Sequence, residues 1–257
     1  MRFLIIGDVI GKPGRKIVGD KLKEIKKKYT IDGVIVNGEN SAGGLGITPE
    51  TCEELLYYGI DVITTGNHIW DKKEILPYID TQEKLLRPLN YPPGVPGYGS
   101  ILLNNNHQKW AVINLSGRVF MSPLDCPFQA VDKELEILRK ETNIILIDFH
   151  AEATSEKIAF GWYCDGRVSC VVGTHTHVVT ADEKILPGGT AYITDIGMTG
   201  AHQSVIGIET KQILSRFLTQ IPVKYTVAKE DVILNSVIVE VDDQTGKSLS
   251  ISRFALR

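Results

Sequence analysis

Two histidines stand one residue apart in the segment Gly173-Thr174-His175-Thr176-His177, which follows the apolar run 170–172. In an extended segment alternate side chains point to the same side, so His175 and His177 are predicted to converge on one spot. Imidazole is a common ligand of transition metals. Because such a pair on its own is more often solvated or hydrogen-bonded than metal-bound, the interpretation depends on which other residues accompany it.

Several other apolar runs also end in residues that could bind a metal. Asp8 follows the run 2–6, Glu39 and Asn40 follow 33–37, Asn67 and His68 follow 62–65, and His150 follows 144–149. Four of the six histidines belong to this set, and His107 and His202 lie outside it. Oxygen and imidazole donors without thiolate suit Fe, Mn, Zn or Co better than Ca.

The donors are too many for one tetrahedral ion, and two ions that share a bridging carboxylate fit their number. Two metals about 3.5–4 Å apart can bind one phosphate across both ions and lower the pKa of a bridging water towards roughly 7. The resulting hydroxide can attack phosphorus in line. The chemistry that this set predicts is therefore hydrolysis of a phosphate ester.

Strands and helices alternate along most of the chain. The predicted strands cover 2–6, 33–37, 62–65, 110–115, 144–149, 170–172, 191–194, 232–241 and 249–254, with a hairpin turn at 242–246. The predicted helices cover 13–29, 49–58, 71–79, 131–141, 155–162 and 213–218. This alternation predicts an α/β fold with a largely parallel sheet, in which ligands bind beyond the carboxyl ends of the strands. No linker or repeat divides the chain, so residues 1–257 are expected to form one domain.

Composition excludes several other classes of protein. The chain has 257 residues, 43% of them apolar, and a net charge of −3 with acids and bases interspersed, which argues against a nucleic-acid partner. No apolar run approaches the roughly 20 residues of a membrane span, and the N-terminus does not resemble a signal peptide. We expect a cytoplasmic protein with no membrane partner. The four cysteines, expected to be reduced and not to be ligands, are Cys52, Cys126, Cys164 and Cys170.

Two glycine-rich segments and three charged residues have less definite roles. The glycines of residues 7–14 do not have the Gly-x-Gly-x-x-Gly spacing of a dinucleotide-binding loop. Residues 41–46 lack the Gly-Lys-Ser/Thr sequence of a phosphate-binding loop. Arg118 and Arg167 are candidates to meet a phosphate group, although a surface role fits each of them as well. Asp195 follows the strand at 191–194 and is expected to support a loop.

The ordered motifs of the chain resemble those of the calcineurin-like metallophosphoesterases. They are Asp8, Gly-Glu-Asn at 38–40, Gly-Asn-His at 66–68, His150 and Gly-Thr-His-Thr-His at 173–177. The similarity is closest to the bacterial YmdB-like cyclic-nucleotide phosphodiesterases, and it extends through residues 66–71, 148–157 and 192–198. The resemblance implies a four-layer α/β/β/α metallophosphoesterase sandwich with two central β-sheets.

The same resemblance implies a role for each motif residue. Asp8, Glu39, Asn40 and His177 would hold the first metal position, and Glu39, Asn67, His150 and His175 the second. His68 would be the general acid that protonates the leaving oxygen. The chain departs from the wider superfamily at Ile10, where a histidine is usual, and at Glu39, where the bridging residue is usually aspartate.

The sequence therefore predicts a binuclear metal-dependent phosphodiesterase that hydrolyses 2′,3′- and/or 3′,5′-cyclic nucleotides by metal-bridged hydroxide attack. Fe or Mn are the expected metals, with Zn or Mg as alternatives, and the expected partner is a small-molecule phosphodiester. The sequence leaves self-association open. One alternative function is a metal-dependent amidohydrolase, which would normally place H-x-H after its first strand, where this chain has Asp8. Another is a non-enzymatic metal- and nucleotide-binding regulator, which has no need of an acid at His68.

Overall fold

A computed structural model of the chain describes residues 1–105 and 108–257, and His107 lies outside the described residues. A first sheet has the strand order β2-β11-β12-β1-β3-β4, with β13 paired to β12. Its strands are β1 (Arg2–Ile6), β2 (Asp8–Val9), β3 (Gly33–Asn37), β4 (Val62–Thr64), β11 (Met198–Ala201), β12 (Val232–Val241) and β13 (Ser248–Leu256). Strands β1, β3 and β4 run parallel, whereas β12 and β13 form the antiparallel hairpin that the sequence predicts.

A second sheet has the order β5-β6-β7-β8-β10-β9. Its strands are β5 (Ser100–Asn105), β6 (Gln108–Ser116), β7 (Ile145–His150), β8 (Cys170–Thr174), β9 (Lys184–Ile185) and β10 (Ala191–Ile193). The four inner strands from β6 to β10 are parallel, and antiparallel strands close both edges. Each sheet is therefore mixed: the second sheet has a parallel centre, whereas in the first sheet β12 lies near the middle and runs antiparallel to β1 and β11.

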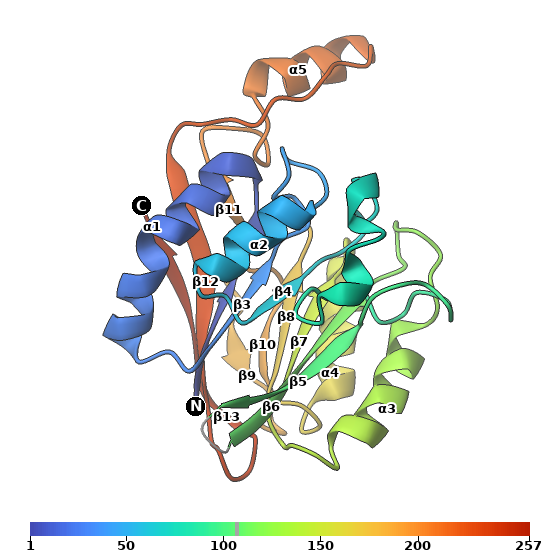
Figure 1. The fold of residues 1–257 in the computed structure, drawn as a ribbon, viewed down its shortest axis with the longest axis vertical. Helices are drawn as coiled ribbons and strands as arrows, with labels where there is room; N and C mark the ends of the chain where they lie inside the picture. Colours follow the sequence, from blue (N-terminus) through green and yellow to red (C-terminus); the bar gives the residue numbers. More distant parts are fainter. Residues whose placement is uncertain (106–107) are drawn as a thin grey trace.

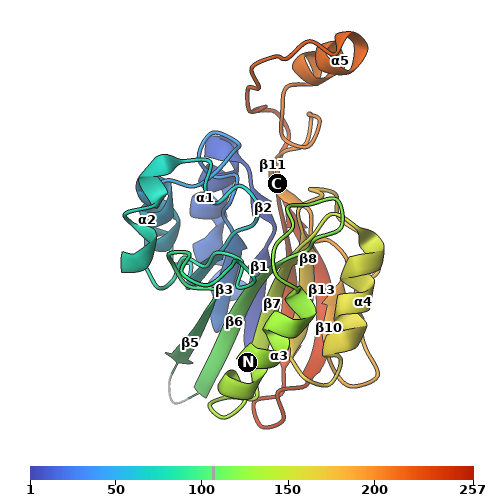
Figure 2. The same cartoon turned by 90° about the vertical axis from the view of Figure 1, so that its right-hand side faces the viewer.

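Alternating apolar residues place the two sheets face to face between helices. Phe3 and Ile5 pack against the second sheet, while Leu4 and Ile6 of the same strand pack under helices. Figure 2 shows α1 (Gly11–Tyr29) and α2 (Pro49–Tyr57) on one side and α3 (Pro127–Leu138) and α4 (Thr154–Cys164) on the other. The predicted four-layer α/β/β/α sandwich with two central β-sheets is confirmed.

One predicted helix is wrong. Residues 71–79 form only two short 3₁₀ segments, Lys73–Ile75 and Ile79–Thr81. Pro77 has no N–H group, so an α-helix through this segment would lose a backbone hydrogen bond at that point. Ile75 and Ile79 are nevertheless buried in the core. The apolar residues of this segment therefore face the core as expected, but the backbone between them is not an α-helix.

The fifth helix, α5 (Thr210–Thr219), stands apart from the four layers (Figure 1). It follows β11 at the edge where the parallel strands of both sheets end. Among the described residues, no helix is both long and apolar enough to cross a membrane. All four cysteines are free, and three of them are buried.

Candidate metal centre

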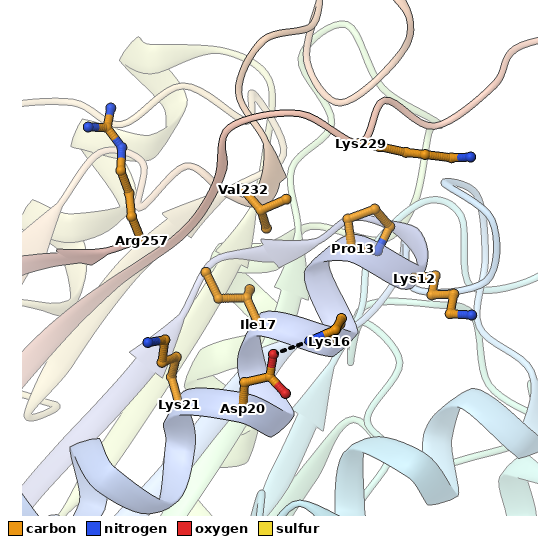
Figure 3. Close-up of a pocket in the computed structure, with 9 residues that line it drawn as sticks. All are labelled: Lys12, Pro13, Lys16, Ile17, Asp20, Lys21, Lys229, Val232 and Arg257. Atoms are coloured by element: carbon orange, nitrogen blue, oxygen red, sulfur yellow. Dashed lines mark hydrogen bonds and ion pairs between the residues drawn. The ribbon is translucent and has the colours of Figure 1, made fainter.

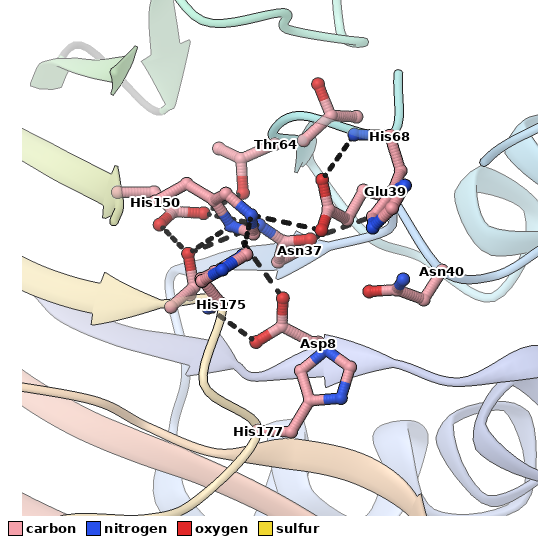
Figure 4. A network of polar contacts seen from close by, with 12 residues as sticks. Asp8, Asn37, Glu39, Asn40, Thr64, His68, His150, His175 and His177 are labelled. Carbon is pink, nitrogen blue, oxygen red and sulfur yellow. Dashed lines mark hydrogen bonds and ion pairs between the residues drawn. The ribbon is translucent and has the colours of Figure 1, made fainter. Parts of the chain in front are cut away.

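The predicted site residues all lie at the carboxyl ends of the strands. Asp8 begins β2, which follows β1 directly, and His150 is the last residue of β7. The turns after β3, β4 and β8 supply the remaining residues, which are Glu39, Asn40, Asn67, His68, His175 and His177. Figure 4 shows the labelled members of this set, Asp8, Glu39, Asn40, His68, His150, His175 and His177, gathered in one region.

Three of the seven predicted ligands converge on one atom of a fourth. His150 Nε2 lies 3.0 Å from Glu39 Oε1, 3.0 Å from Asn67 Oδ1 and 3.0 Å from His175 Nδ1. Two ligands about 2.1 Å from one ion and at right angles to each other are about 3.0 Å apart. The spacing of these atoms therefore fits donors that share one cation. They are the four residues that the resemblance assigns to the second metal position.

Three buried oxygen atoms mark the place predicted for the first metal. Asp8 Oδ1 and Asn40 Oδ1 are buried and have no hydrogen-bond partner among the described residues, and buried Glu39 Oε1 has only His150 Nε2, 3.0 Å away, beside it. The Asn40 amide donates to Gly44 O at 3.1 Å, which fixes its oxygen on the opposite side. Because burying unpaired acceptors is unfavourable, oxygens left in this state fit a cation that would satisfy them.

The two histidines after β8 are not positioned in the way predicted: ligand atoms of His175, Glu39 and His150 lie within 4.8 Å of one another, and among the described residues His177 is not part of that group. The strand ends at Thr174, and His175 and His177 have φ values of 99° and 65°, so neither is in an extended segment. The prediction that strand alternation aligns them is wrong. Both residues have left-handed backbone conformations in a turn, which orients each ring independently of the other. Such a conformation persists only where surrounding contacts hold it.

An accepting partner at one nitrogen of each of these two rings leaves the other nitrogen unprotonated. His175 Nε2 lies 2.9 Å from Glu152 Oε2, and His177 Nδ1 lies 3.1 Å from Ile206 O. Each of these nitrogens carries the proton of a neutral ring because its partner accepts, so the other nitrogen keeps a lone pair. His175 Nδ1 and His177 Nε2 are therefore the atoms able to bind a metal.

Charge in this cluster also favours a cation. Burial would raise the pKa of Glu39, but His150 outweighs it and lowers that pKa to about 2. Burial opposes a charge on His150, yet Glu39, Asp8 and Asp148 raise its pKa to about 9. Burial and His150 lower the pKa of His175 to about 3, which keeps this ring neutral. The carboxylates thus favour a positive charge where His150 Nε2 lies.

A buried polar chain holds the ring of His150 from behind. Its Nδ1 lies 2.9 Å from Thr174 Oγ1, and this hydroxyl donates to Asp148 Oδ1 at 2.7 Å. The Asn37 amide donates to the other Asp148 oxygen at 3.0 Å. With Nδ1–H given to Thr174, the ring presents the Nε2 lone pair to the donor cluster.

Replacing Thr174 with valine tests this chain. Valine keeps the shape but removes the acceptor for His150 Nδ1–H, so we expect metal affinity at the His150 position to fall about 10–100-fold. Titration of chelator-treated protein with Mn²⁺ or Zn²⁺ measures the change. Thr174→Ser should restore the affinity. Thr190→Val is the control, because Thr190 is also a buried threonine whose hydroxyl donates a hydrogen bond, here to Val168 O at 2.7 Å, and it lies just before β10, away from the site. Unchanged affinity in Thr174→Val would contradict the role of the chain.

A buried ion pair fixes the turn that carries His175 and His177. Lys157 Nζ lies 2.7 Å from Asp195 Oδ2 and donates to Thr174 O at 2.7 Å. The same Asp195 oxygen accepts from the backbone N–H of Thr176 at 3.1 Å and from its hydroxyl at 2.8 Å. These contacts agree with the expectation that Asp195 supports a loop.

His68 lies beside the donor cluster. Its backbone N–H donates to Glu39 Oε2 at 3.2 Å, and its Nδ1 lies 2.8 Å from Asp71 Oδ2. The side chain is 30% exposed, so it can reach a bound substrate. Because Asp71 engages Nδ1, the nitrogen that remains for substrate is Nε2.

A cavity of about 420 Å³ opens beside the cluster and is lined by Asn67, His175 and the segment 120–122. Gly66 lets the backbone reach the floor of this region, since a Cβ there would lie 2.1 Å from the His150 ring. Phe120, 89% exposed and with φ of 62°, stands at the mouth of the cavity. The opening can admit a small molecule to the donor cluster.

The two candidate arginines have different positions. Arg118 follows β6 at the edge that carries the site, and its guanidinium Nη2 lies 3.3 Å from Cys126 Sγ. Arg167 precedes β8, at the opposite edge, and pairs with Asp132 of α3. Arg167 is therefore not placed to meet a phosphate at the site.

The two-sheet sandwich with carboxylate, amide and imidazole donors at its carboxyl edge defines a protein of the metallophosphoesterase type. The solved NAD nucleotidase (NadN) of Haemophilus influenzae shares the fold, with a TM-score of 0.63 and 13% identity, over 98% of this chain and 55% of that chain.

The chain belongs to the YmdB-like protein family, whose model matches residues 4–254. It is 51% identical to the 2′,3′-cyclic-nucleotide 2′-phosphodiesterase of Bacillus subtilis (strain 168), over 100% of this chain and 97% of that protein. A hypothetical protein of Thermus thermophilus is 42% identical with a TM-score of 0.93, over 100% of this chain and 99% of that chain. The family that the motifs predict is confirmed.

The sequence analysis did not predict several residues that support the site. Glu152, Asp71 and Thr174 lie inside or beside the motifs, so their positions offered a signal that was not used. Asn37 and Asp148 offered a weaker one, because both stand within strands that are typical of a core.

Proposed function

We propose that the chain is a binuclear metal-dependent phosphodiesterase that hydrolyses cyclic nucleotides. The observation that carries this proposal is the convergence of Glu39, Asn67 and His175 on His150 Nε2, beside the unpaired oxygens of Asp8 and Asn40. Fe or Mn suits this mixed set of donors, with Zn or Mg as alternatives. The name of the Bacillus subtilis relative supports 2′,3′-cyclic nucleotides as the first substrates to test.

The residues of the site would have different roles in such a reaction. Bound metals would supply an activated water and polarise the phosphate. Glu39 would be shared by the two positions, as the family motifs imply; its Oε1 lies 3.0 Å from His150 Nε2, and its Oε2 accepts from the backbone N–H of His68. His68 would give its proton to the ribose oxygen as the phosphorus–oxygen bond breaks, and Asp71, 2.8 Å from Nδ1, orients its ring.

A substrate panel tests the proposal. We expect catalytic efficiency to be higher on 2′,3′-cyclic AMP and bis-p-nitrophenyl phosphate than on p-nitrophenyl phosphate. A terminal phosphate carries a second negative charge that an arginine could bind. Arg167 pairs with Asp132 at the opposite edge of the sheet, so it is not placed to contact a phosphate at the site. The panel is run with Mn, Fe, Zn and Mg, and 3′,5′-cyclic AMP is included. A clear preference for the monoester would contradict the proposal.

The two alternative functions have less support. Membership of the YmdB-like family points away from an amidohydrolase, and so does Asp8 after the first strand. The contact between His68 and Asp71 favours an enzyme over a binding protein, which has no use for an oriented acid. We also propose that residues 1–257 act as one domain, because both sheets supply site residues and share one core between them. A cytoplasmic location and the lack of a nucleic-acid partner remain predictions.

A further inference from the structure

The loop that follows β6 carries an aromatic side chain that packs against almost nothing. Phe120 is 89% exposed and has a φ of 62°. Single exposed apolar side chains are common on protein surfaces and by themselves indicate no function. A bulky residue in the left-handed region is rare, however, because its Cβ crowds the backbone there. The loop therefore holds Phe120 in an unfavourable conformation without burying its ring.

Buried polar side chains fix this conformation from both ends of the loop. The carboxylate of Glu156 on α4 accepts backbone hydrogen bonds from Arg118 at 3.0 Å and from Val119 at 3.1 Å. The amide of Asn90 donates to Asp125 O at 2.9 Å and ties the far end. Both Glu156 and Asn90 are buried. Because surrounding contacts hold the backbone, the exposed ring keeps one position, and strain of this kind is typical of functional sites.

Phe120 also lines the cavity beside the candidate metal centre. This cavity of about 420 Å³ is shared with two predicted metal ligands, Asn67 and His175, and its remaining lining residues are Met121 and Ser122. Its volume lies within the range of roughly 300–1,000 Å³ that is usual for small-molecule sites. A molecule in this cavity thus meets metal-binding groups and a flat apolar ring at the same time.

We propose that Phe120 stacks against the nucleobase of the substrate while the phosphate lies at the donor cluster. Aromatic side chains bind bases in this way because every base has a π-face. A cyclic nucleotide carries an anionic phosphate and a planar base on one ribose, so it matches both kinds of lining. This inference rests on the proposed function and adds the residue that selects a nucleotide over a simple phosphodiester.

Stacking also predicts an order among the bases. The contact is made with the face of the base and not with its hydrogen-bonding edges, so each base is accepted and the larger face binds better. We therefore expect 2′,3′-cyclic AMP to be a better substrate than 2′,3′-cyclic UMP. Phe120→Ala should reduce this difference, because it removes the surface on which the two faces are compared.

A groove along α1 offers a different surface for a nucleotide. It has a volume of about 500 Å³ and an apolar floor formed by Pro13, Ile17 and Val232. Figure 3 shows its cationic rim, which consists of Lys12, Lys16, Lys21, Lys229 and Arg257. The residues described around this groove include no predicted metal ligand. A nucleotide held there by charge would have no metal donor beside its phosphate, so the groove serves as a control site.

Catalytic efficiency on two matched substrates tests the proposal. 2′,3′-Cyclic AMP has a base, whereas methyl β-D-ribofuranoside 2,3-cyclic phosphate has the same reacting bonds and no base. We expect Phe120→Ala to lower kcat/KM on cyclic AMP about 5–150-fold, the usual share of one stacked base, and to affect the methyl riboside far less. Phe120→Trp should retain the efficiency. Tyr57→Ala is the control, because Tyr57 is 88% exposed at the end of α2, and both efficiencies should be unchanged.

Binding of adenosine 3′-monophosphate gives a readout that does not depend on turnover. Isothermal titration calorimetry of metal-reconstituted protein should show weaker binding in Phe120→Ala by about the same 5–150-fold. The double substitution Lys21→Ala/Lys229→Ala removes two charges from the groove along α1 and should leave binding unchanged. Circular dichroism checks that each variant is folded.

Three outcomes would overturn the proposal. They are equal losses on both substrates in Phe120→Ala, a wild type that hydrolyses the methyl riboside as efficiently as cyclic AMP, and nucleotide binding that survives Phe120→Ala but weakens in the groove variant. The last would assign the nucleotide to the groove along α1. A wild type that hydrolyses neither substrate, yet binds the nucleotide through Phe120, contradicts only the phosphodiesterase, whereas equal activity on both substrates contradicts only the stacking.

Discussion

Replacing Glu39 with glutamine is expected to empty both metal positions of the candidate centre. The exposed fraction of Glu39 is 1%, and burial disfavours its charge, yet His150 lowers its pKa to about 2, so the side chain is a carboxylate. Glutamine keeps the shape but offers a neutral amide in place of the charge that both positions would share. We expect metal content to fall from two ions to none and turnover to fall at least about 10²–10³-fold.

The matched control is Glu156→Gln. Glu156 is also buried and accepts backbone hydrogen bonds from Arg118 and Val119, but it belongs to no donor set. It should keep both metals. Elemental analysis of protein purified without chelator and reconstituted with Mn or Fe gives the number of ions. A wild type that never holds more than one ion, or a Glu39→Gln variant that holds two, would contradict the binuclear centre.

The positions of the site residues could be inferred from the sequence because each ends an apolar run. His150 is the simplest case, since it closes a fully buried parallel strand and its place follows from the fold class alone. Glu39 and Asn67 follow short strands of the other sheet, and the same rule brings them to the shared edge. The identity of the fold as two sheets rather than one came from the family motifs, because periodicity does not say which strands pair.

Contacts between distant segments could not be inferred in the same way. The chain from His150 through Thr174 to Asp148 joins two strands, and Asn37 enters it from the other sheet. Only the packing of the sheets brings these residues together. The orientation of His175 was also unpredictable, because its positive φ arises from a turn held by tertiary contacts and not from local preference.

The failed helix at 71–79 shows a local limit of pattern analysis. The segment has apolar residues at Ile75 and Ile79, a spacing of four that suits a helix, and both are buried. Pro77 between them outweighs that spacing by removing a backbone donor. Asp71 begins this segment and contacts His68, so the irregular backbone directly follows a functional residue.

Replacing His68 with alanine is expected to lower turnover on 2′,3′-cyclic AMP about 10²–10⁴-fold, the usual share of general acid catalysis. The metals should stay bound, because His68 contacts Glu39 through its backbone N–H, which alanine retains. The loss should depend on the leaving group. The ribose oxygen is a poor leaving group that needs a proton, whereas p-nitrophenolate needs little, so bis-p-nitrophenyl phosphate should be affected far less.

Asp71→Asn provides a graded companion to this substitution. The carboxylate of Asp71 lies 2.8 Å from His68 Nδ1 and orients the ring as an acceptor, whereas an amide is a weaker acceptor and would orient it less firmly. The variant should therefore lose activity in the same substrate order as His68→Ala, but by a smaller factor. If His68 were instead a metal ligand or a structural residue, its loss would reduce metal content or folding and would depress both substrates equally. Metal content and the two turnover numbers, measured on the same preparation, decide between these roles, because only an acid gives full metal content together with unequal losses.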